Sequence, residues 1–293
     1  MTPVKTPPFK TPARDLTYSL RGTLGKAVLL VHGMTGAPGE MKFLAKRLHR
    51  RGFTIAAPLL AGHGVDEANL LRTTWQDWLG SVRDAYRALK ADHDEVYIAG
   101  ICVGGALGLA LAAEDPSVAG TAVYSMTYRY DGWNMKRWYS AIAPYAERLA
   151  SLPLVRRVSF VEPYPFGLKD ERLRDGMAAT QGAVIPGALD RVPLGAMAEM
   201  HWLSAHLDSV APLIHQPTLI LHAQDDDMSH PRNAYRLRDK LGGPVALHLL
   251  DDCYHMIHVD RQRDLVGDLT ADFFGAPPAV PRVRRASAEP VDA

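Results

Sequence analysis

Short β-rich runs alternate with amphipathic helical patterns along most of this chain, and this alternation limits the folds that it can adopt. Six runs are expected to be strands: AVLLVHG (27–33), TIAAPLL (54–60), EVYIAG (95–100), VAGTAVYSM (118–126), PTLILHA (217–223) and VALHLL (245–250). Helical patterns lie between them, as they do where helices connect the strands of a parallel sheet. The sequence therefore predicts an α/β fold, with a mostly parallel sheet flanked by helices.

The stretch TTWQDWLGSVRDAYRALK (73–90) shows how clearly some of these helices are marked. Thr74 and Asp77 have the spacing of a capping box, which predicts the helix N-terminus. Apolar side chains then recur on one face at helical spacing: Trp75, Trp78, Leu79, Val82, Tyr86 and Leu89. We expect these aromatic residues to belong to the core, because the helical spacing explains all of them.

The pattern changes between Met126 and Pro217, where the segment is rich in aromatic residues and looks mostly helical. A loop of that length without structure would be unusual. We therefore predict a mainly helical cap (127–212) inserted into a core made of residues 21–126 and 213–275. Residues 1–20 are expected to be a flexible N-terminal segment. The Pro-, Ala- and Arg-rich tail (276–293) is expected to be disordered.

Composition excludes several classes of function. The formal net charge of +1 gives no electrostatic reason to expect nucleic acid or an anionic membrane as a partner. No run approaches the length of a membrane span, and prolines interrupt the N-terminus where an export signal needs apolar residues. The only two cysteines, Cys102 and Cys253, suit a reducing compartment. We expect a soluble, cytoplasmic protein, with no metal because no zinc-ligand spacing is present.

The string G-I-C-V-G (100–104) lies directly after a predicted strand and before a predicted helix. This is the context of a nucleophile elbow, a strained turn whose neighbours two before and two after must be very small. Gly100 and Gly104 fill those positions and Cys102 occupies the centre. At the N-terminus of a helix, the partial positive charge favours the thiolate form of a cysteine. Cys102 is therefore the candidate nucleophile.

The partners of an elbow nucleophile follow in the order acid, then histidine, at the carboxyl ends of later strands. The string 251-DDCYHMIH-258 places His255 in a loop just beyond the last predicted strand. His255 would take the proton from the nucleophile and return it to the leaving group. His258 is a rival, although its position resembles the start of the following helix.

The acid lies in 224-QDDDMSHP-231, which contains three consecutive aspartates. Asp226 is the preferred residue, because it would orient the imidazole and stabilise its charged form. Asp225 and Asp227 remain alternatives to it, and each could instead be a solvated turn residue or a helix cap.

The loop 31-VHGMTG-36 follows the first core strand. In this arrangement that loop donates one backbone N–H to an oxyanion hole, and the residue after the nucleophile donates another. We therefore expect the amides of Met34 and Val103 to form the hole. His32 is expected to support the loop and to have no catalytic role.

Several of these strings carry a resemblance to a known family: VLLVHGMTGAPGEMKFLAKRL, APLLAGHG, IAGICVGG, HAQDDDMSHP and CYHMIHVD. Together they resemble a bacterial carboxylesterase of the monoacylglycerol-lipase-like group. The resemblance implies an α/β-hydrolase fold with a small helical cap and no cofactor, with the acid at Asp226 and the histidine at His255. The chain departs from that group at Cys102, where the group has serine, and at Tyr254, where it usually has glycine. We expect Tyr254 to narrow the pocket beside the base.

A cysteine nucleophile narrows the chemistry. A thiolate is a better leaving group than an alkoxide, so esters, lactones and thioesters suit it better than amides. We therefore predict an ester hydrolase acting on small or medium acyl esters through a thioester acyl-enzyme. Dienelactone hydrolases and enzymes of intracellular polyhydroxyalkanoates resemble this arrangement in their elbow cysteine, which suggests a hydroxyalkanoate ester or oligomer as substrate.

Two other functions use the same residues. An acyltransferase or thioesterase would employ the same Cys-His-Asp triad, and a non-catalytic ligand-binding protein could retain the scaffold. The intact acid and histidine argue against the second of these. A redox link between Cys102 and Cys253 is conceivable, but a structural role for Cys253 is favoured.

Overall fold

Seven strands form one sheet in the order β1-β3-β2-β4-β5-β8-β9. Every neighbouring pair is parallel except β1 with β3, so the predicted mostly parallel sheet is confirmed. The computed structural model describes residues 10, 12, 15–135, 152–179 and 185–275. The strands of this sheet are β1 (Tyr18–Leu20), β2 (Lys26–Val31), β3 (Thr54–Ala57), β4 (Glu95–Ile101), β5 (Gly120–Tyr124), β8 (Thr218–Ala223) and β9 (Val245–Leu250).

Strand β1 is a correction to the sequence analysis. Tyr18–Leu20 lies within residues 1–20, which we expected to be flexible, and that expectation is wrong for these three residues. The strand pairs antiparallel with β3, with Tyr18 opposite Ala57 and Leu20 opposite Ile55. Three residues show too little alternation of apolar and polar side chains for a strand to be recognised from the sequence.

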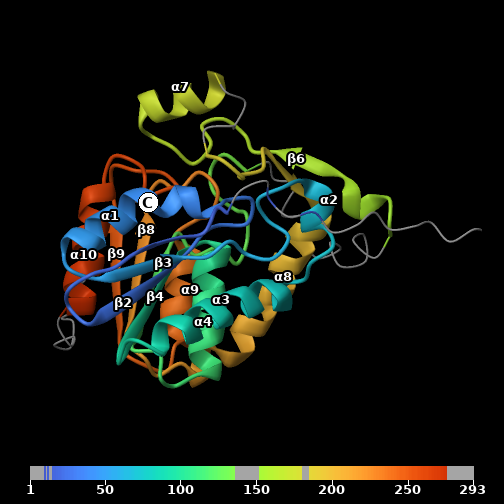
Figure 1. Cartoon of the computed structure of the whole chain (residues 1–293). Coiled ribbons are helices and arrows are strands. Elements are labelled where there is room, and N and C mark those ends of the chain that lie inside the picture. Colours follow the sequence, from blue (N-terminus) through green and yellow to red (C-terminus); the bar gives the residue numbers. More distant parts are fainter. Residues whose placement is uncertain (1–9, 11, 13–14, 136–151, 180–184, 276–293) are drawn as a thin grey trace, which may run out of the picture.

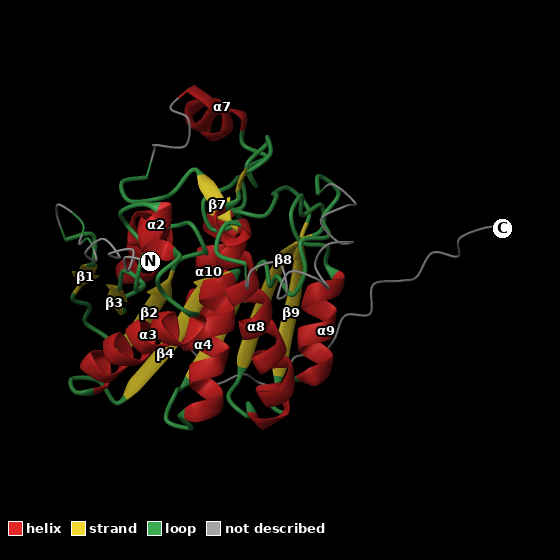
Figure 2. Cartoon of the chain, turned by 90° about the vertical axis from the view of Figure 1, so that its right-hand side faces the viewer, coloured by secondary structure: helices red, strands yellow, loops and turns green. Residues whose placement is uncertain are grey.

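Helices cover both faces of the sheet (Figure 1). Helices α1 (Lys42–Arg50) and α10 (Arg263–Gly275) pack together on one face. The other face carries α3 (Trp75–Lys90), α4 (Val103–Glu114), α8 (Leu194–Val210) and α9 (Arg232–Lys240), and Figure 2 shows α3, α4 and α8 beside one another. Shorter helical turns are η1 (Pro38–Met41), α2 (Glu67–Leu70), η3 (Val155–Arg157) and η4 (Ala211–Leu213). None of the described helices is long and apolar enough to cross a membrane.

Helix α3 begins at the predicted capping box. The Thr74 hydroxyl accepts from the Asp77 N–H, and the Asp77 carboxylate accepts from the Thr74 N–H at 2.8 Å. Caps of this kind contribute about 1 kcal/mol to helix stability. Most of the predicted apolar face is buried, with Trp78 and Tyr86 among the largest fully buried side chains, while Trp75 and Leu89 are partly buried and pack against the core.

The segment between β5 and β8 begins beyond the carboxyl ends of the parallel strands (Figure 1). Strands β6 (Ser159–Val161) and β7 (Arg191–Pro193) form a separate antiparallel pair, and α7 (Glu171–Ala179) lies above them. Helix α8, in contrast, packs against α4 of the core. The domain boundaries, including the 127–212 cap, stay a prediction. Parts of that segment, 136–151 and 180–184, and the predicted disordered tail lie outside the described residues.

Candidate active site

Cys102 occupies a sharp turn between β4 and α4. Its backbone has φ 51° and ψ −114°, a left-handed conformation that costs a residue with a side chain on the order of 1–3 kcal/mol. The Cys102 N–H donates to the Tyr124 carbonyl oxygen at 2.9 Å, and the Ala106 N–H donates to the Cys102 carbonyl oxygen at 3.1 Å. The turn is therefore fixed to β5 on one side and to α4 on the other.

The two glycines that flank Cys102 are required by close backbone approach. A Cβ atom at Gly100 would lie 2.4 Å from the carbonyl carbon of Gly104. A Cβ atom at Gly104 would lie 2.3 Å from the carbonyl oxygen of Val31. Both distances are far below van der Waals contact, so any larger residue would displace α4 from β2 and β4.

His255 and Asp226 meet from the loops that follow β9 and β8. The Nδ1 atom of His255 lies 2.9 Å and 3.0 Å from the two carboxylate oxygens of Asp226. The Cys102 side chain lies close enough to His255 to influence its pKa, and both residues line one cavity. The structure therefore brings the three predicted residues together, with His255 hydrogen-bonded to Asp226 and close to Cys102, and all three are buried.

The protonation states of this pair follow from their contacts. Burial alone would lower the pKa of His255, but the charge of Asp226, the hydrogen bond to Asp226 and the nearby Cys102 raise this pKa well above its ordinary value. Burial alone would raise the pKa of Asp226, but the charge of His255 and their hydrogen bond lower it. Asp226 therefore stays ionised, and His255 takes up a proton readily.

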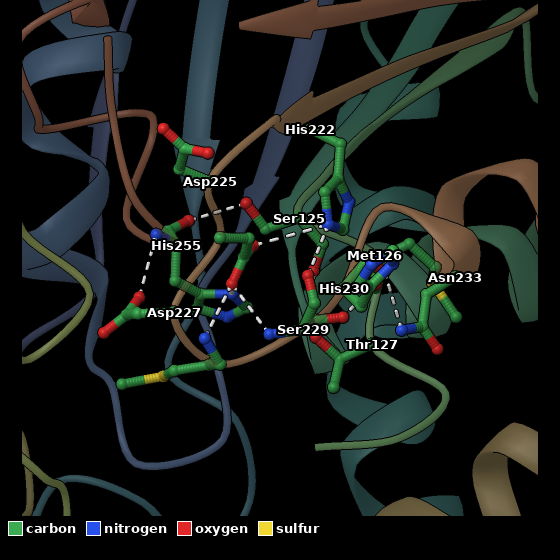
Figure 3. A network of polar contacts seen from close by, with 12 residues as sticks. Ser125, Met126, Thr127, His222, Asp225, Asp227, Ser229, His230, Asn233 and His255 are labelled. Carbon is green, nitrogen blue, oxygen red and sulfur yellow. Dashed lines mark hydrogen bonds and ion pairs between the residues drawn. The ribbon is translucent and has the colours of Figure 1, made fainter. Parts of the chain in front are cut away.

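A buried polar network holds Asp226 in place. One carboxylate oxygen accepts from the Met228 N–H at 2.9 Å and from the Ser229 N–H at 2.7 Å. The Nε2 atom of His222 lies 3.4 Å from the other oxygen and 2.7 Å from the Ser229 carbonyl oxygen. Figure 3 shows His222, Ser229 and His255 converging on this point. The carboxylate can therefore turn little about its own bonds.

The main chain of His255 is held separately. The Ser125 hydroxyl donates to the His255 carbonyl oxygen at 2.6 Å (Figure 3). Ser125 itself has φ 47°, which makes it the second strained residue at a strand end beside this site. Its N–H donates to the Leu221 carbonyl oxygen at 2.9 Å, so the end of β5 is fixed to β8.

The two aspartates beside Asp226 differ from one another. Asp225 is exposed, as expected of a solvated turn residue. Asp227 is buried, and its carboxylate accepts from the main-chain N–H groups of His255 at 3.3 Å and Gly167 at 3.1 Å. The alternative reading of Asp227 as a solvated turn residue or helix cap is therefore wrong. Burial, followed by the charge of Asp226, raises the pKa of Asp227 to about 6.

His258, the rival to His255, is fully buried. Neither of its ring nitrogens has a hydrogen-bond partner among the described residues. Burial, followed by the charge of His255, lowers the pKa of His258 to about 3. The geometry therefore favours His255 as the base.

The loop after β2 is supported by two histidines. The Nδ1 atom of His32 lies 2.9 Å from the Gly33 carbonyl oxygen, which agrees with the supporting role expected of it. The Nε2 atom of His63 lies 2.5 Å from the Met34 carbonyl oxygen. Met34 lines the cavity described below, and Val103 is the buried first residue of α4. The assignment of their amides to an oxyanion hole stays a prediction.

A cavity of about 460 Å³ opens beside Cys102 and His255. Met34 and Ile101 line it from the core, and much of the remaining apolar lining comes from the segment between β5 and β8. That contribution includes Val161, Phe166, Met177, Ile185, Leu189 and Val192. The volume lies within the range of about 300–1,000 Å³ that is typical of small-molecule sites.

A family model described as serine aminopeptidase, S33, matches residues 23–262 of this chain. The chain belongs to this family. The matched range includes Cys102, Asp226 and His255, together with the loop after β2.

Two curated relatives match this chain over most of the length of both proteins. A thermostable monoacylglycerol lipase from Bacillus sp. is 26% identical over 258 residues, covering 88% of this chain and 92% of the lipase. A carboxylesterase from Bacillus subtilis is 25% identical over 243 residues, covering 82% and 89% of the two chains.

Solved structures of other proteins share the fold of this chain. A metagenome-derived lipolytic enzyme superposes with a TM-score of 0.75 at 24% identity, covering 91% of this chain and 99% of that one. A monoacylglycerol lipase from Paleococcus ferrophilus gives a TM-score of 0.73 at 18% identity, covering 88% and 97%. The α/β-hydrolase fold implied by the sequence resemblance is therefore confirmed.

Three polar residues of the cavity were not singled out from the sequence: Tyr130, Glu40 and Glu162. The Tyr130 side chain lies beside Cys102 in this cavity. Burial, followed by the charges of Cys102 and Glu162, raises the pKa of Tyr130 well above its ordinary value, so its hydroxyl remains a donor. No local pattern marks these positions, because each reaches the cavity from a loop or a short helical turn.

Two sequence expectations concern residues next to His255. Cys253 is buried and, like Cys102, a free thiol, so the proposed redox link stays a prediction. Tyr254 does not line the cavity among the described residues. Its ring instead packs against Trp133, with centroids 5.5 Å apart. The expectation that Tyr254 narrows the pocket is therefore wrong, because the ring packs against Trp133 and is not part of the cavity lining.

Proposed function

We propose that this protein hydrolyses carboxylic esters, with Cys102 as nucleophile, His255 as general base and acid, and Asp226 as the residue that orients His255. The observation that carries the proposal is the hydrogen bond between His255 and Asp226, together with the placing of Cys102 and His255 side by side in the lining of one cavity. Membership of a hydrolase family supports it, and two relatives are named as a lipase and a carboxylesterase.

In the proposed reaction, the Cys102 sulfur attacks the ester carbonyl carbon and its proton resides on His255. The carbonyl oxygen becomes an oxyanion, which the main-chain amides of Met34 and Val103 would stabilise. Collapse of this adduct breaks the bond to the alcohol oxygen, which receives the proton from His255. Water, deprotonated by His255, then attacks the thioester, and the acid leaves as Cys102 regains its proton.

The cavity supports small or medium acyl chains as the substrate class. Its lining is mainly apolar and includes Cys102, so we expect an acyl chain to lie against Phe166, Met177 and Leu189 while its carbonyl reaches Cys102. We infer that the 127–212 segment acts as a cap, since it supplies much of this lining. Hydroxyalkanoate esters belong to the substrate class.

The test compares wild type with Cys102→Ala and Cys102→Ser on p-nitrophenyl esters of graded chain length. We expect Cys102→Ala to lose at least about 10³-fold in kcat, because the covalent step is removed. Intact-mass spectrometry of wild type should show one acyl group on Cys102, in an adduct that hydroxylamine removes. Cys102→Ser should retain weak turnover through an oxygen ester.

Iodoacetamide gives an independent arm of this test. Alkylation of Cys102 should abolish turnover in step with the mass change, while Cys253, buried and away from the cavity lining, should stay unmodified. Turnover that survives complete alkylation of Cys102, or in Cys102→Ala, would reject the proposed nucleophile.

A further inference from the structure

Glu40 is a buried carboxyl group enclosed by the loop proposed to bind the oxyanion. It belongs to η1, directly after that loop, and is 6% exposed. The Gly33 N–H donates to one of its carboxylate oxygens at 2.7 Å. A Cβ atom at Gly36 would lie 2.1 Å from the other oxygen, so the loop folds tightly around the group. Glu40 and Met34 line the same cavity as Cys102.

An ionised carboxylate at this place would oppose the proposed reaction. The tetrahedral intermediate carries a negative charge on the former carbonyl oxygen, and the loop must stabilise that charge. A second negative charge held by the same loop, in a site with little water, would repel it. A neutral carboxyl group would not, and it would still accept the Gly33 N–H.

The surroundings of Glu40 favour the neutral form. Burial is the main cause that raises the pKa of Glu40 to about 7, and the charge of Glu162 adds to this rise. The hydrogen bond from Gly33 and the charge of His255 act in the opposite direction. Glu162 reaches the cavity from the segment after β6 and accepts from the Thr35 hydroxyl at 3.2 Å. Two carboxyl groups in one cavity disfavour each other's ionisation.

The cavity lining also includes two charged residues besides Glu40, Glu162 and His255. Asp190 and Arg191 line the cavity but are exposed, so solvent weakens their effect. The charge of Asp226 raises the pKa of His255, which moves its titration away from that of Glu40. Glu40→Gln separates the two groups in the experiment below, because it removes the titration of Glu40 and leaves His255 in place.

We propose that Glu40 is a positioning residue for the loop after β2, and that the loop stabilises the oxyanion when Glu40 carries its proton. This inference rests on the proposed ester hydrolysis at Cys102. Glu40 acts through the loop and touches none of the reacting atoms. Ionisation of Glu40 releases its proton to solvent and leaves the enzyme folded but slow.

The test is the pH profile of kcat/KM for a p-nitrophenyl acyl ester between about pH 5 and about pH 9. Wild type should lose about tenfold per pH unit above about pH 7, as expected when a single protonated group is required. Glu40→Gln keeps an acceptor for Gly33 and cannot ionise. It should match wild type within about threefold below pH 6 and lack the fall above pH 7.

Two further variants make the result specific. Glu114→Gln, at the far end of α4 from Cys102, removes an exposed carboxylate and should leave the profile of wild type unchanged. Glu162→Gln removes a negative neighbour of Glu40, so the midpoint of the fall should move to lower pH. This variant tests the inference even if Glu40→Gln does not fold.

The outcomes separate the inference from the proposed function. An alkaline fall that persists in Glu40→Gln, or a wild-type profile that is flat across neutral pH, would overturn the role of Glu40 while acylation of Cys102 still stood. An absence of acyl-enzyme on Cys102 in wild type would remove both.

Discussion

Asp226 combines an ionised carboxylate with a fixed orientation. Its two oxygens share contacts with His255, with the Met228 and Ser229 N–H groups and with His222. An amide in its place could still accept at one oxygen, but its NH₂ group would face the ring nitrogen of His255. The substitution would therefore disturb the orientation and the charge state of the His255 imidazole and leave the fold intact.

We therefore expect Asp226→Asn to lower kcat by about 10²- to 10³-fold, less than the roughly 10⁴-fold cost in a serine triad, because a thiol depends less on its base. Steady-state ester hydrolysis measures this. Asp225→Asn is the matched control, because Asp225 is the exposed neighbour, and it should stay within about twofold of wild type. Similar losses in the two variants would argue against Asp226 as the triad acid.

Tyr130 lies beside Cys102 in the cavity, and we expect its hydroxyl to donate to the Cys102 thiolate. A hydrogen bond to a charged group contributes about 1.5–3 kcal/mol, so loss of the Tyr130 hydroxyl should remove stabilisation of negative charge on the sulfur. The remaining thiolate becomes more nucleophilic and recovers about half of that effect on a logarithmic scale. We expect alkylation by iodoacetamide to slow about three- to tenfold in Tyr130→Phe, as followed by mass spectrometry.

Tyr128→Phe is the control for this measurement. The Tyr128 hydroxyl is buried and has no hydrogen-bond partner among the described residues, so its removal should not change the rate at Cys102. If Tyr130→Phe is alkylated as fast as Tyr128→Phe, the hydrogen bond does not stabilise the thiolate.

At the scale of elements, the elbow depends on how closely α4 approaches β2. Gly104→Ala would place a methyl group 2.3 Å from the Val31 carbonyl oxygen, and backbone cannot move aside as a flexible side chain can. We expect a loss of about 1–3 kcal/mol in the free energy of unfolding, together with a displaced Cys102 that iodoacetamide modifies at a changed rate. Urea unfolding and alkylation kinetics measure the two effects.

Gly80→Ala is the matched glycine substitution. Gly80 lies in α3, and a Cβ atom there would meet nothing within 4 Å. Alanine favours a helix over glycine by about 0.5–1 kcal/mol, so this variant should be slightly more stable than wild type. A loss of stability in Gly80→Ala as large as in Gly104→Ala would show that the approach of α4 is not the cause.

The elements were predictable where a local pattern is sufficient to define them. The six apolar runs became β2, β3, β4, β5, β8 and β9, and the capping box at Thr74 gave the start of α3. Strand β1 was missed because its stability comes from pairing with β3 and hardly from its own three residues. The turn at Cys102 was predictable because its steric demand appears in the sequence as two nearby glycines.

At the scale of the whole molecule, the rest of the site depends on contacts that no local pattern encodes. Thr35 reaches Glu162 across 127 positions of sequence, and Ser125 reaches His255 across 130. Tyr130 and Glu40 enter the cavity in the same way, from a loop and a short turn. The proposed triad followed from motif order, whereas the polar groups around it became visible only once the chain was folded.

Buried carboxyl groups also link the whole fold to pH. The pKa of Glu40 rises from 4.5 to about 7, and that of Asp227 from 3.8 to about 6, in both cases mainly through burial. The folded state therefore holds protons that the unfolded chain has already released. Stability is greatest below the unfolded values and falls as pH rises through the folded ones. The window for Glu40 lies between about pH 4.5 and about pH 7.

Glu40→Gln should remove the share of this loss that belongs to Glu40. The difference between 4.5 and about 7 corresponds to roughly 3 kcal/mol of unfolding free energy at pH 8. The free energy of unfolding of Glu40→Gln, measured relative to wild type by urea unfolding, should therefore rise by roughly 3 kcal/mol between about pH 4 and about pH 8. Both proteins should still lose the stability that depends on protonated Asp227. Glu114→Gln should run parallel to wild type across the same range. Parallel curves for Glu40→Gln and wild type would mean that Glu40 ionises as readily in the folded protein as in the unfolded chain.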